Sequence, residues 1–246
     1  MGIIAAALLA ACAFSPPYAG EVCPSFLYEP AYCMDTVLRG EPRAYVPQPG
    51  DIMVYTDSNR FWEITHDLAL AFQPHGSGIV VQRPDGTLGI LEAGPNDTLA
   101  CGVLDLIPHL CQYEAKGPVW IRKRKTPLTP EQSARLTEFA MRQAGKRFAL
   151  IRLGGQLTPL RSRGPLRTYF LGKPHGDRSG YFCSELVLEA AVYAGLLDPK
   201  TTRPCATYPH ELFFDRSINF YLNRHFTLAA DWDPPARWLS HVAPNP

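Results

Sequence analysis

Cys183 has the sequence context of a nucleophilic cysteine. It lies at the start of a predicted helix over residues 182–194, which Gly195 ends. The partial positive charge of a helix N-terminus stabilises a thiolate, and the thiolate is the form of cysteine that attacks a carbonyl carbon. A single cysteine at such a place is more often a small buried apolar residue, so catalysis also requires a base nearby.

A predicted β-hairpin offers the base and a partner that would orient it. Two β-branched runs, 77–82 and 87–92, flank the turn tripeptide at 84–86. His75 precedes the first strand and Glu92 ends the second, so antiparallel pairing brings the two residues to the same end of the hairpin. A thiol nucleophile, an imidazole base and an orienting carboxylate make up a hydrolase site without a cofactor. The other interpretation of Glu92 is a salt bridge at a sheet edge.

Other chemistries do not fit the spacing of the candidate residues. Ser77 lies in His-Gly-Ser-Gly-Ile, where the glycines adjoin the serine, whereas the serine-hydrolase nucleophile elbow places them two positions away. The same stretch lacks the lysine of a phosphate-binding loop. The cysteines and histidines form neither a CxxC pair nor an HExxH motif, so we expect no metal. A net charge of +1 excludes a strong nucleic-acid footprint over the whole chain.

The elements that would position these residues are a cluster of strands followed by separate helices. Besides the hairpin and the 182–194 helix, we expect a strand at 51–55, a helix within 61–72, a strand at 118–123, and helices from Thr129 to Gly145 and from Pro209 to about Asn223. No βαβ pattern repeats. The fold class predicted by this order is α+β.

Five segments resemble, in their order along the chain, the permuted papain-like hydrolases. They are PGDI (49–52), HGSGIV (75–80), LEAGP (91–95), YFCSELV (181–187) and TYPHEL (207–212). The group is the NlpC-like thiol amidases and peptidases that are YiiX-like, and the resemblance covers about residues 47–215. It implies a circularly permuted papain-like fold with a small antiparallel sheet packed against helices. It also implies these site residues: Cys183 as nucleophile, His75 as base, Glu92 as orienting residue, and Gly76, Ser77, Tyr181 and Ser184 as candidates for the substrate cleft.

The chain departs from that family pattern at the base. The pattern reads His-x-Gly-Ile, and here Gly76 stands two positions before Gly78, so His75 is displaced by one residue. A shift of one residue reverses the face to which a strand side chain points. We expect His75 to serve if a kink at Gly76 turns its ring inward, with His66 as the weaker substitute. A second departure is at 145–148, where relatives tend to have a tyrosine-aspartate pair after the glycine.

Three functions remain open at this point. The first is a thiol hydrolase that cleaves amide bonds of peptides or cell-wall peptides through a Cys183 acyl-enzyme. The second is a lipid-directed thiol esterase or acyltransferase, because a similar permuted core supports acyl transfer in lecithin–retinol acyltransferase-like proteins. The third is a catalytically degenerate member that binds a ligand, because Gly76 occupies the expected base position. The expected partner is a peptide or peptidoglycan-like substrate, or a lipid, and not a nucleic acid.

The N-terminal apolar run 3–11 predicts export. It is far shorter than the ~20 residues that span a bilayer and has the length of a signal-peptide core. It ends in Leu-Ala-Ala-Cys, which resembles the cleavage site of bacterial lipoproteins, so we expect cleavage before Cys12 and membrane anchoring through the lipidated cysteine. Because no Lys or Arg precedes the run, the other interpretation is a hydrophobic N-terminus without a signal function. A cell-envelope or periplasmic location permits disulfides, and the candidate pairs are Cys23/Cys33 and Cys101/Cys111.

The 246 residues, 46% of them hydrophobic, predict one hydrolase domain with extensions. We expect a signal segment at 1–19, a Pro-rich lead-in at 20–46, the domain at 47–225 and a C-terminal tail at 226–246. Within the domain, residues 146–178 contain eight basic residues and one acidic residue, Asp177. This basic segment is either a solvated loop or a wall of the cleft that favours carboxylates or phosphates.

Overall fold

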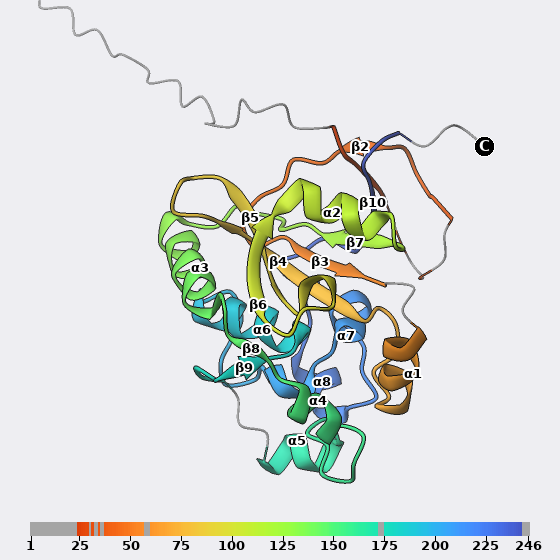
Figure 1. Cartoon of the computed structure of the whole chain (residues 1–246), viewed down its shortest axis with the longest axis vertical. Helices are drawn as coiled ribbons and strands as arrows, with labels where there is room; N and C mark the ends of the chain where they lie inside the picture. The colour runs from red at the N-terminus through yellow and green to blue at the C-terminus, as the bar shows by residue number, and fades with distance from the viewer. Residues whose placement is uncertain are drawn as a thin grey trace, which may run out of the picture.

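One antiparallel sheet organises the protein, shown in Figure 1 as a computed structural model. The structure describes residues 24–242 apart from 30, 32–33, 35–36, 57–59 and 172–174. Within this part of the chain, eight strands pair in the order β2-β1-β10-β7-β3-β4-β5-β6 and all of their pairings are antiparallel. The strands are β1 (Phe26–Tyr28), β2 (Arg43–Ala44), β3 (Ile52–Tyr55), β4 (Gly76–Gln82), β5 (Leu88–Ala93), β6 (Cys101–Asp105), β7 (Val119–Arg122) and β10 (Ala236–Leu239), with a separate parallel pair of β8 (Arg147–Phe148) and β9 (Gly180–Tyr181).

Helices cover both faces of this sheet. Helix α2 lies over one face, and α3, α6 and α7 lie on the other side (Figure 1). Helices α1, α4 and α5 lie toward the lower end of the same view. The helices are α1 (Arg60–Leu68), α2 (Leu106–Glu114), α3 (Pro130–Gln143), α4 (Leu150–Gly155), α5 (Pro165–Leu171), α6 (Cys183–Tyr193), α7 (Pro209–Phe214) and α8 (Phe220–His225).

The central strands are apolar on both sides because each side packs on a helix. In β4, Ile79 and Val81 belong to the core formed with α6, whereas Val80 between them belongs to the core formed with α2. In the neighbouring β5, Leu91 faces α6 and Ile90 faces α2. Successive strand side chains point to opposite faces, so the same alternation decides on which side each functional residue lies.

The local elements predicted from the sequence are confirmed where their signals are short-range. Strands β4 and β5 pair around the 84–86 turn with Gly78 opposite Glu92. Helix α3 begins with the expected capping box: the Gln132 N–H donates to Thr129 Oγ1 over 3.2 Å, and the Thr129 N–H donates to Gln132 Oε1 over 3.0 Å. An antiparallel sheet packed against helices is also confirmed, although it is larger than the small sheet expected.

Three expectations differ from the structure. The helix predicted from Pro209 is two helices, because Asp215 adopts φ 52° and ends α7 while its carboxylate pairs with Arg122. The Pro-rich lead-in and the C-terminal tail supply strands β1, β2 and β10 to the same sheet. The expected Cys101/Cys111 disulfide is wrong: no disulfide joins the two residues, because Cys101 packs in the core on the α6 face and Cys111 packs against the core on the α2 face.

The N-terminal expectations fall on residues that the structure does not describe. The apolar run 3–11, Cys12, Cys23 and Cys33 all lie outside the described residues. In the described part of the chain, none of the helices combines the length and the apolar character needed to cross a membrane.

Candidate active site

Cys183 is the first residue of α6 and is 8% exposed. Its Sγ–H donates a hydrogen bond to the backbone carbonyl of His75 over 3.4 Å, which joins the start of the helix to the start of β4. Burial, helped by the nearby charge of Glu92, raises the pKa of the Cys183 thiol to about 11. The Ser184 backbone N–H and the Ser77 hydroxyl act in the opposite direction without cancelling the effect of burial. Cys183 is therefore a neutral thiol at pH 7.

His75 presents an imidazole that is free to accept a proton. The side chain is buried, and neither ring nitrogen has a hydrogen-bond partner among the described residues. Burial lowers the pKa of His75, opposed by the charge of Asp67, so the ring is neutral at pH 7. The ring lies against that of His66 with 4.9 Å between centroids. A neutral imidazole with an unused lone pair is the form required of a general base.

Cys183 and His75 open into the same small cavity. Its volume is about 60 Å³, enough for a few water-sized groups. The lining residues are Tyr55, His66, His75, Gly76, Ala93, Gly94, Thr98, Leu99, Phe148 and Cys183. Of the predicted cleft residues, Gly76 thus lines the cavity. A substrate group that enters it meets the thiol and the imidazole at once.

The carboxylate of Glu92 is bound by residues that the sequence analysis did not single out. It accepts hydrogen bonds from the hydroxyls of Tyr55, over 2.5 Å, and Tyr113, over 2.7 Å. His109 Nε2 donates to its second oxygen over 2.7 Å. Since the ring nitrogens of His75 have no partner among the described residues, the expected contact between Glu92 and His75 is not formed. His109 and Tyr113 come from α2, a helix for which the sequence offered no catalytic motif.

Tyr55 occupies the space next to Gly76 that a side chain at position 76 would need. The two residues are direct partners across β3 and β4. A Cβ atom built on Gly76 would lie 2.0 Å from the Tyr55 Cζ atom, far inside van der Waals contact. The Tyr55 ring is held there by stacking on Tyr113, with centroids 3.7 Å apart, and by its bond to Glu92. Burial raises the pKa of Tyr55, and so does the charge of Glu92, which keeps the phenol protonated as a donor.

Two predicted cleft residues have structural contacts instead of a place on the cavity wall. Tyr181 packs in the core on the α6 face, and its hydroxyl accepts from the Arg178 N–H over 2.9 Å. The Ser184 hydroxyl donates to the Thr207 carbonyl over 2.8 Å and so ties α6 to the segment before α7. The cavity-lining residues of the described chain include neither of them. Ser77 likewise lies off the lining, beside the Cys183 sulfur.

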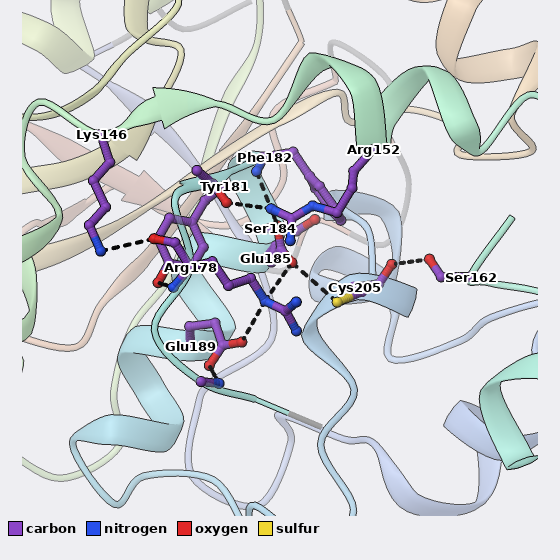
Figure 2. A network of polar contacts seen from close by, with 12 residues as sticks. Lys146, Arg152, Ser162, Arg178, Tyr181, Phe182, Ser184, Glu185, Glu189 and Cys205 are labelled. Atoms are coloured by element: carbon purple, nitrogen blue, oxygen red, sulfur yellow. Dashed lines mark hydrogen bonds and ion pairs between the residues drawn. The ribbon is translucent and has the colours of Figure 1, made fainter. Parts of the chain in front are cut away.

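Two buried carboxylates of α6 anchor the basic segment 146–178 (Figure 2). Glu185 pairs with Arg152 over 2.9 Å and with Arg178 over 3.2 Å. Glu189 pairs with the same Arg178 over 3.5 Å and accepts from the Gly176 N–H over 3.1 Å. Burial raises the pKa of both carboxyls, that of Glu189 to about 7. The segment is thus attached to the nucleophile helix and is not a freely solvated loop.

Cys205 also bonds to Glu185 and so belongs to the same network of polar contacts. Its Sγ–H donates to Glu185 Oε1 over 3.2 Å, and burial raises its pKa to about 12. Glu185 Oε2 also accepts from the Phe182 N–H over 3.4 Å, immediately before the nucleophile. The polar contacts in Figure 2 therefore fix the backbone at the start of α6, which positions Cys183.

Comparisons with known proteins show a distant similarity to a solved structure. No protein-family model and no curated protein matches the chain. Among solved structures, the chain is similar to a crystal structure of the metalloprotein YiiX from Escherichia coli O157:H7, with 20% identity and a TM-score of 0.41. The similarity covers 61% of this chain and 67% of that protein. At this level of similarity it carries no conclusion about activity. The described residues of this chain bring together no group of three or more His, Cys, Asp or Glu that could hold a metal ion.

Proposed function

We propose that the protein is a thiol hydrolase in which Cys183 is the nucleophile and His75 is the general base. The observation that supports this most is that the two side chains line one cavity while both ring nitrogens of His75 lack a partner among the described residues. A buried imidazole without a hydrogen bond is costly, and such groups gather at functional sites. The two parts that acyl transfer requires, a nucleophile and a base, share one cavity; the Cys183 thiol bonds to the His75 carbonyl, so it must turn toward the His75 ring when substrate enters.

The reaction begins from a neutral thiol and a neutral imidazole. His75 takes the thiol proton as the sulfur attacks the carbonyl carbon, and the charge that develops on the carbonyl oxygen faces the N-terminus of α6. The C–N bond of the amide then breaks, and the imidazolium returns the proton to the leaving amine. Water, deprotonated by the same imidazole, hydrolyses the thioester and restores the thiol.

The proposed substrates are amide bonds of peptides or cell-wall peptides. As part of the same proposal, the N-terminal apolar run directs export of the protein, and Cys12 anchors it to the membrane. In this proposal the fold is a circularly permuted papain-like one. The chain order supports it, because the base, immediately before β4, precedes the nucleophile on α6 by 108 residues. Glu92 acts on the site by its charge and by fixing Tyr55, and not by orienting the base.

A second candidate function is ligand binding without turnover. It is favoured by Tyr55, which fills the place next to Gly76 and bonds to the carboxylate that would orient a histidine there. In that case the cavity binds a small group, and the thiol stays protonated. The two candidates differ in whether Cys183 ever becomes acylated.

An acylation experiment separates them. The protein is incubated with an activated acyl ester and with a panel of peptide amides, and the mass of the Cys183 peptide is followed over time. We expect a transient acyl adduct on wild type, none on Cys183→Ala, and a much slower adduct on His75→Ala. His175→Ala, a change at an exposed histidine, is the matched control and keeps the wild-type rate. A wild type that forms no adduct and hydrolyses no more than Cys183→Ala would overturn the hydrolase and leave the binding protein.

A further inference from the structure

One side of the molecule is built from two stretches of chain that contain no acidic residue. Residues 147–176 and 216–230 lack both Asp and Glu. The first stretch contains α4 and α5, and the second contains α8. Helices α5 and α8 are in contact, and the Asn219 amide before α8 donates to Thr168 Oγ1 of α5 over 2.7 Å and to the Arg163 carbonyl over 3.0 Å. The two stretches therefore pack together, and neither contributes an acidic side chain to the surface that they form.

Large apolar side chains project from this surface. Leu166 and Phe170 of α5 are 74% and 73% exposed, and Phe220 of α8 is 70% exposed. Ile151 of α4 is 93% exposed, and Leu160 in the following loop is 72% exposed. Between α5 and α8 lies a groove of about 230 Å³ with mainly apolar walls. Exposed apolar groups in such number on one side mark a surface that contacts another apolar phase.

Four arginines of the same surface fall into two pairs that differ in their surroundings. Arg152 and Arg163 are turned inward, where they pair with Glu185 and Glu211. The exposed guanidinium groups of Arg167 and Arg224 instead form no ion pair with any residue that the structure describes, and Arg224 lies on the wall of the apolar groove. These arginine side chains have no acidic partner within the described residues, and they lie among exposed Leu and Phe side chains. Such a surface is complementary to a lipid layer with an apolar interior and anionic headgroups.

We propose that this surface, consisting of α4, α5, α8 and the loop between α4 and α5, docks on a phospholipid bilayer that contains anionic headgroups. Leu166, Phe170 and Phe220 enter the boundary between headgroups and acyl chains, while Arg167 and Arg224 bind phosphates at the rim. This geometry is that of an interfacially bound protein, which lies on the membrane without crossing it. The three short helices in Figure 1 belong to one side of the molecule, as such docking requires.

Docking in this way places the Cys183 cavity close to the lipid. Phe148, immediately before α4, lines the cavity, and so does Leu99, whose side chain is 57% exposed. The docking surface is therefore adjacent in the chain to a wall of the cavity. The inference does not depend on catalysis by Cys183, and it stands or falls separately from the proposed hydrolase.

Vesicle sedimentation tests the docking surface. The full chain carrying Cys183→Ser is mixed with phosphatidylcholine vesicles, with or without phosphatidylglycerol, and the bound fraction is measured at low and high salt. We expect binding to the anionic vesicles that weakens at high salt. Arg167→Gln and Arg224→Gln should each lower the partition coefficient roughly fivefold, the effect of one basic residue at an anionic surface. Leu166→Ser combined with Phe220→Ser should lower the bound fraction to that seen with neutral vesicles, because it removes the inserted apolar groups.

Matched controls are available on β2 and just after it, in another part of the fold. Val46→Ser removes an apolar side chain that is 68% exposed, and Arg43→Gln removes an exposed arginine. Both should bind vesicles like the parent. The N-terminal apolar run is present in every variant, so differences among them report on the docking surface alone. Equal binding to neutral and anionic vesicles, unchanged binding of the Arg167 and Leu166 variants, or equal binding to a soluble acidic polymer would overturn the proposal.

Discussion

The reactivity of Cys183 toward a small alkylating agent follows from its burial. Its pKa is raised from the ordinary 9.0 to about 11. That change lowers the thiolate fraction at pH 7 about 100-fold. A more basic thiolate is also a better nucleophile, and over this range the gain is roughly tenfold. Cys183 should therefore react with iodoacetamide about tenfold more slowly than a free cysteine at pH 7, with burial of the sulfur slowing it further.

The assay is a pH series of alkylation rates read at the level of single peptides. Mass spectrometry of the digest assigns the rate to Cys183, and a Cys183→Ser sample confirms the assignment. We expect the rate to keep rising with pH through 9 and to level off only near 11. Ser77→Ala provides the internal check. Because the Ser77 hydroxyl lowers the pKa of the thiol, its removal should slow the reaction at every pH below the plateau.

A plateau of the alkylation rate below pH 7 would refute this reasoning. It would mean that a thiolate already exists at rest, paired with a protonated imidazole. The proposed mechanism, in which a neutral His75 takes the proton only during attack, would then be wrong in its first step. A Ser77→Ala protein that reacts faster than wild type would likewise contradict the described environment of the sulfur.

Three further predictions concern stability. Burial raises the pKa of Glu189 from 4.5 to about 7, so between these pH values the folded protein binds a proton that the unfolded chain does not. The free energy of unfolding should therefore fall by about 3 kcal/mol as pH rises across this range. In urea titrations, Glu189→Gln should remove this pH dependence. Tyr55→Phe should cost about 1.5–3 kcal/mol by removing a buried hydrogen bond to Glu92. Gly76→Ala should cost about 3 kcal/mol or more in thermal unfolding, because its methyl group would overlap the Tyr55 ring.

Each of these has a result that would contradict it. Parallel pH profiles for wild type and Glu189→Gln would show that this carboxyl titrates near its ordinary pKa. A Tyr55→Phe protein as stable as wild type would show that the phenol bond to Glu92 adds nothing net. If Gly76→Ala is neutral, the Tyr55 ring moves aside at little cost, and the space beside position 76 is not as constrained as the packing indicates.

The parts of the fold that were predictable are those with short-range physical causes. The 84–86 turn dictates the hairpin, the Thr129 capping box starts α3, and the change in pattern before Cys183 marks the start of α6. Strand β10 was not predictable, because its four residues follow two prolines and become a strand only by pairing with β1 and β7. The single helix expected from Pro209 fails for a similar reason, since Asp215 ends it by binding Arg122, far away in the chain.

The candidate site was predictable in its residue types but not in its contacts. Cys183 and His75 do meet at one cavity, as the hairpin and helix signals imply. Glu92 was assigned to His75, yet strand alternation turns it toward α2, where His109 and Tyr113 bind it. Those partners lie beyond the hairpin and are brought to Glu92 only when α2 packs on the sheet. The place of Tyr55 over Gly76 is likewise a matter of tertiary packing.

Strand β10 also constrains the order in which the sheet can form. It lies between β1 and β7, so the first strands of the chain join the sheet through one of the last. During synthesis from the N-terminus, β7 can pair with β3 while its other edge stays open, and β1 has no route to the sheet. Unpaired edges are where partly folded chains associate with one another. A nascent or truncated chain lacking residues 236–239 is therefore expected to aggregate through β7, and this edge is protected only when β10 pairs with it.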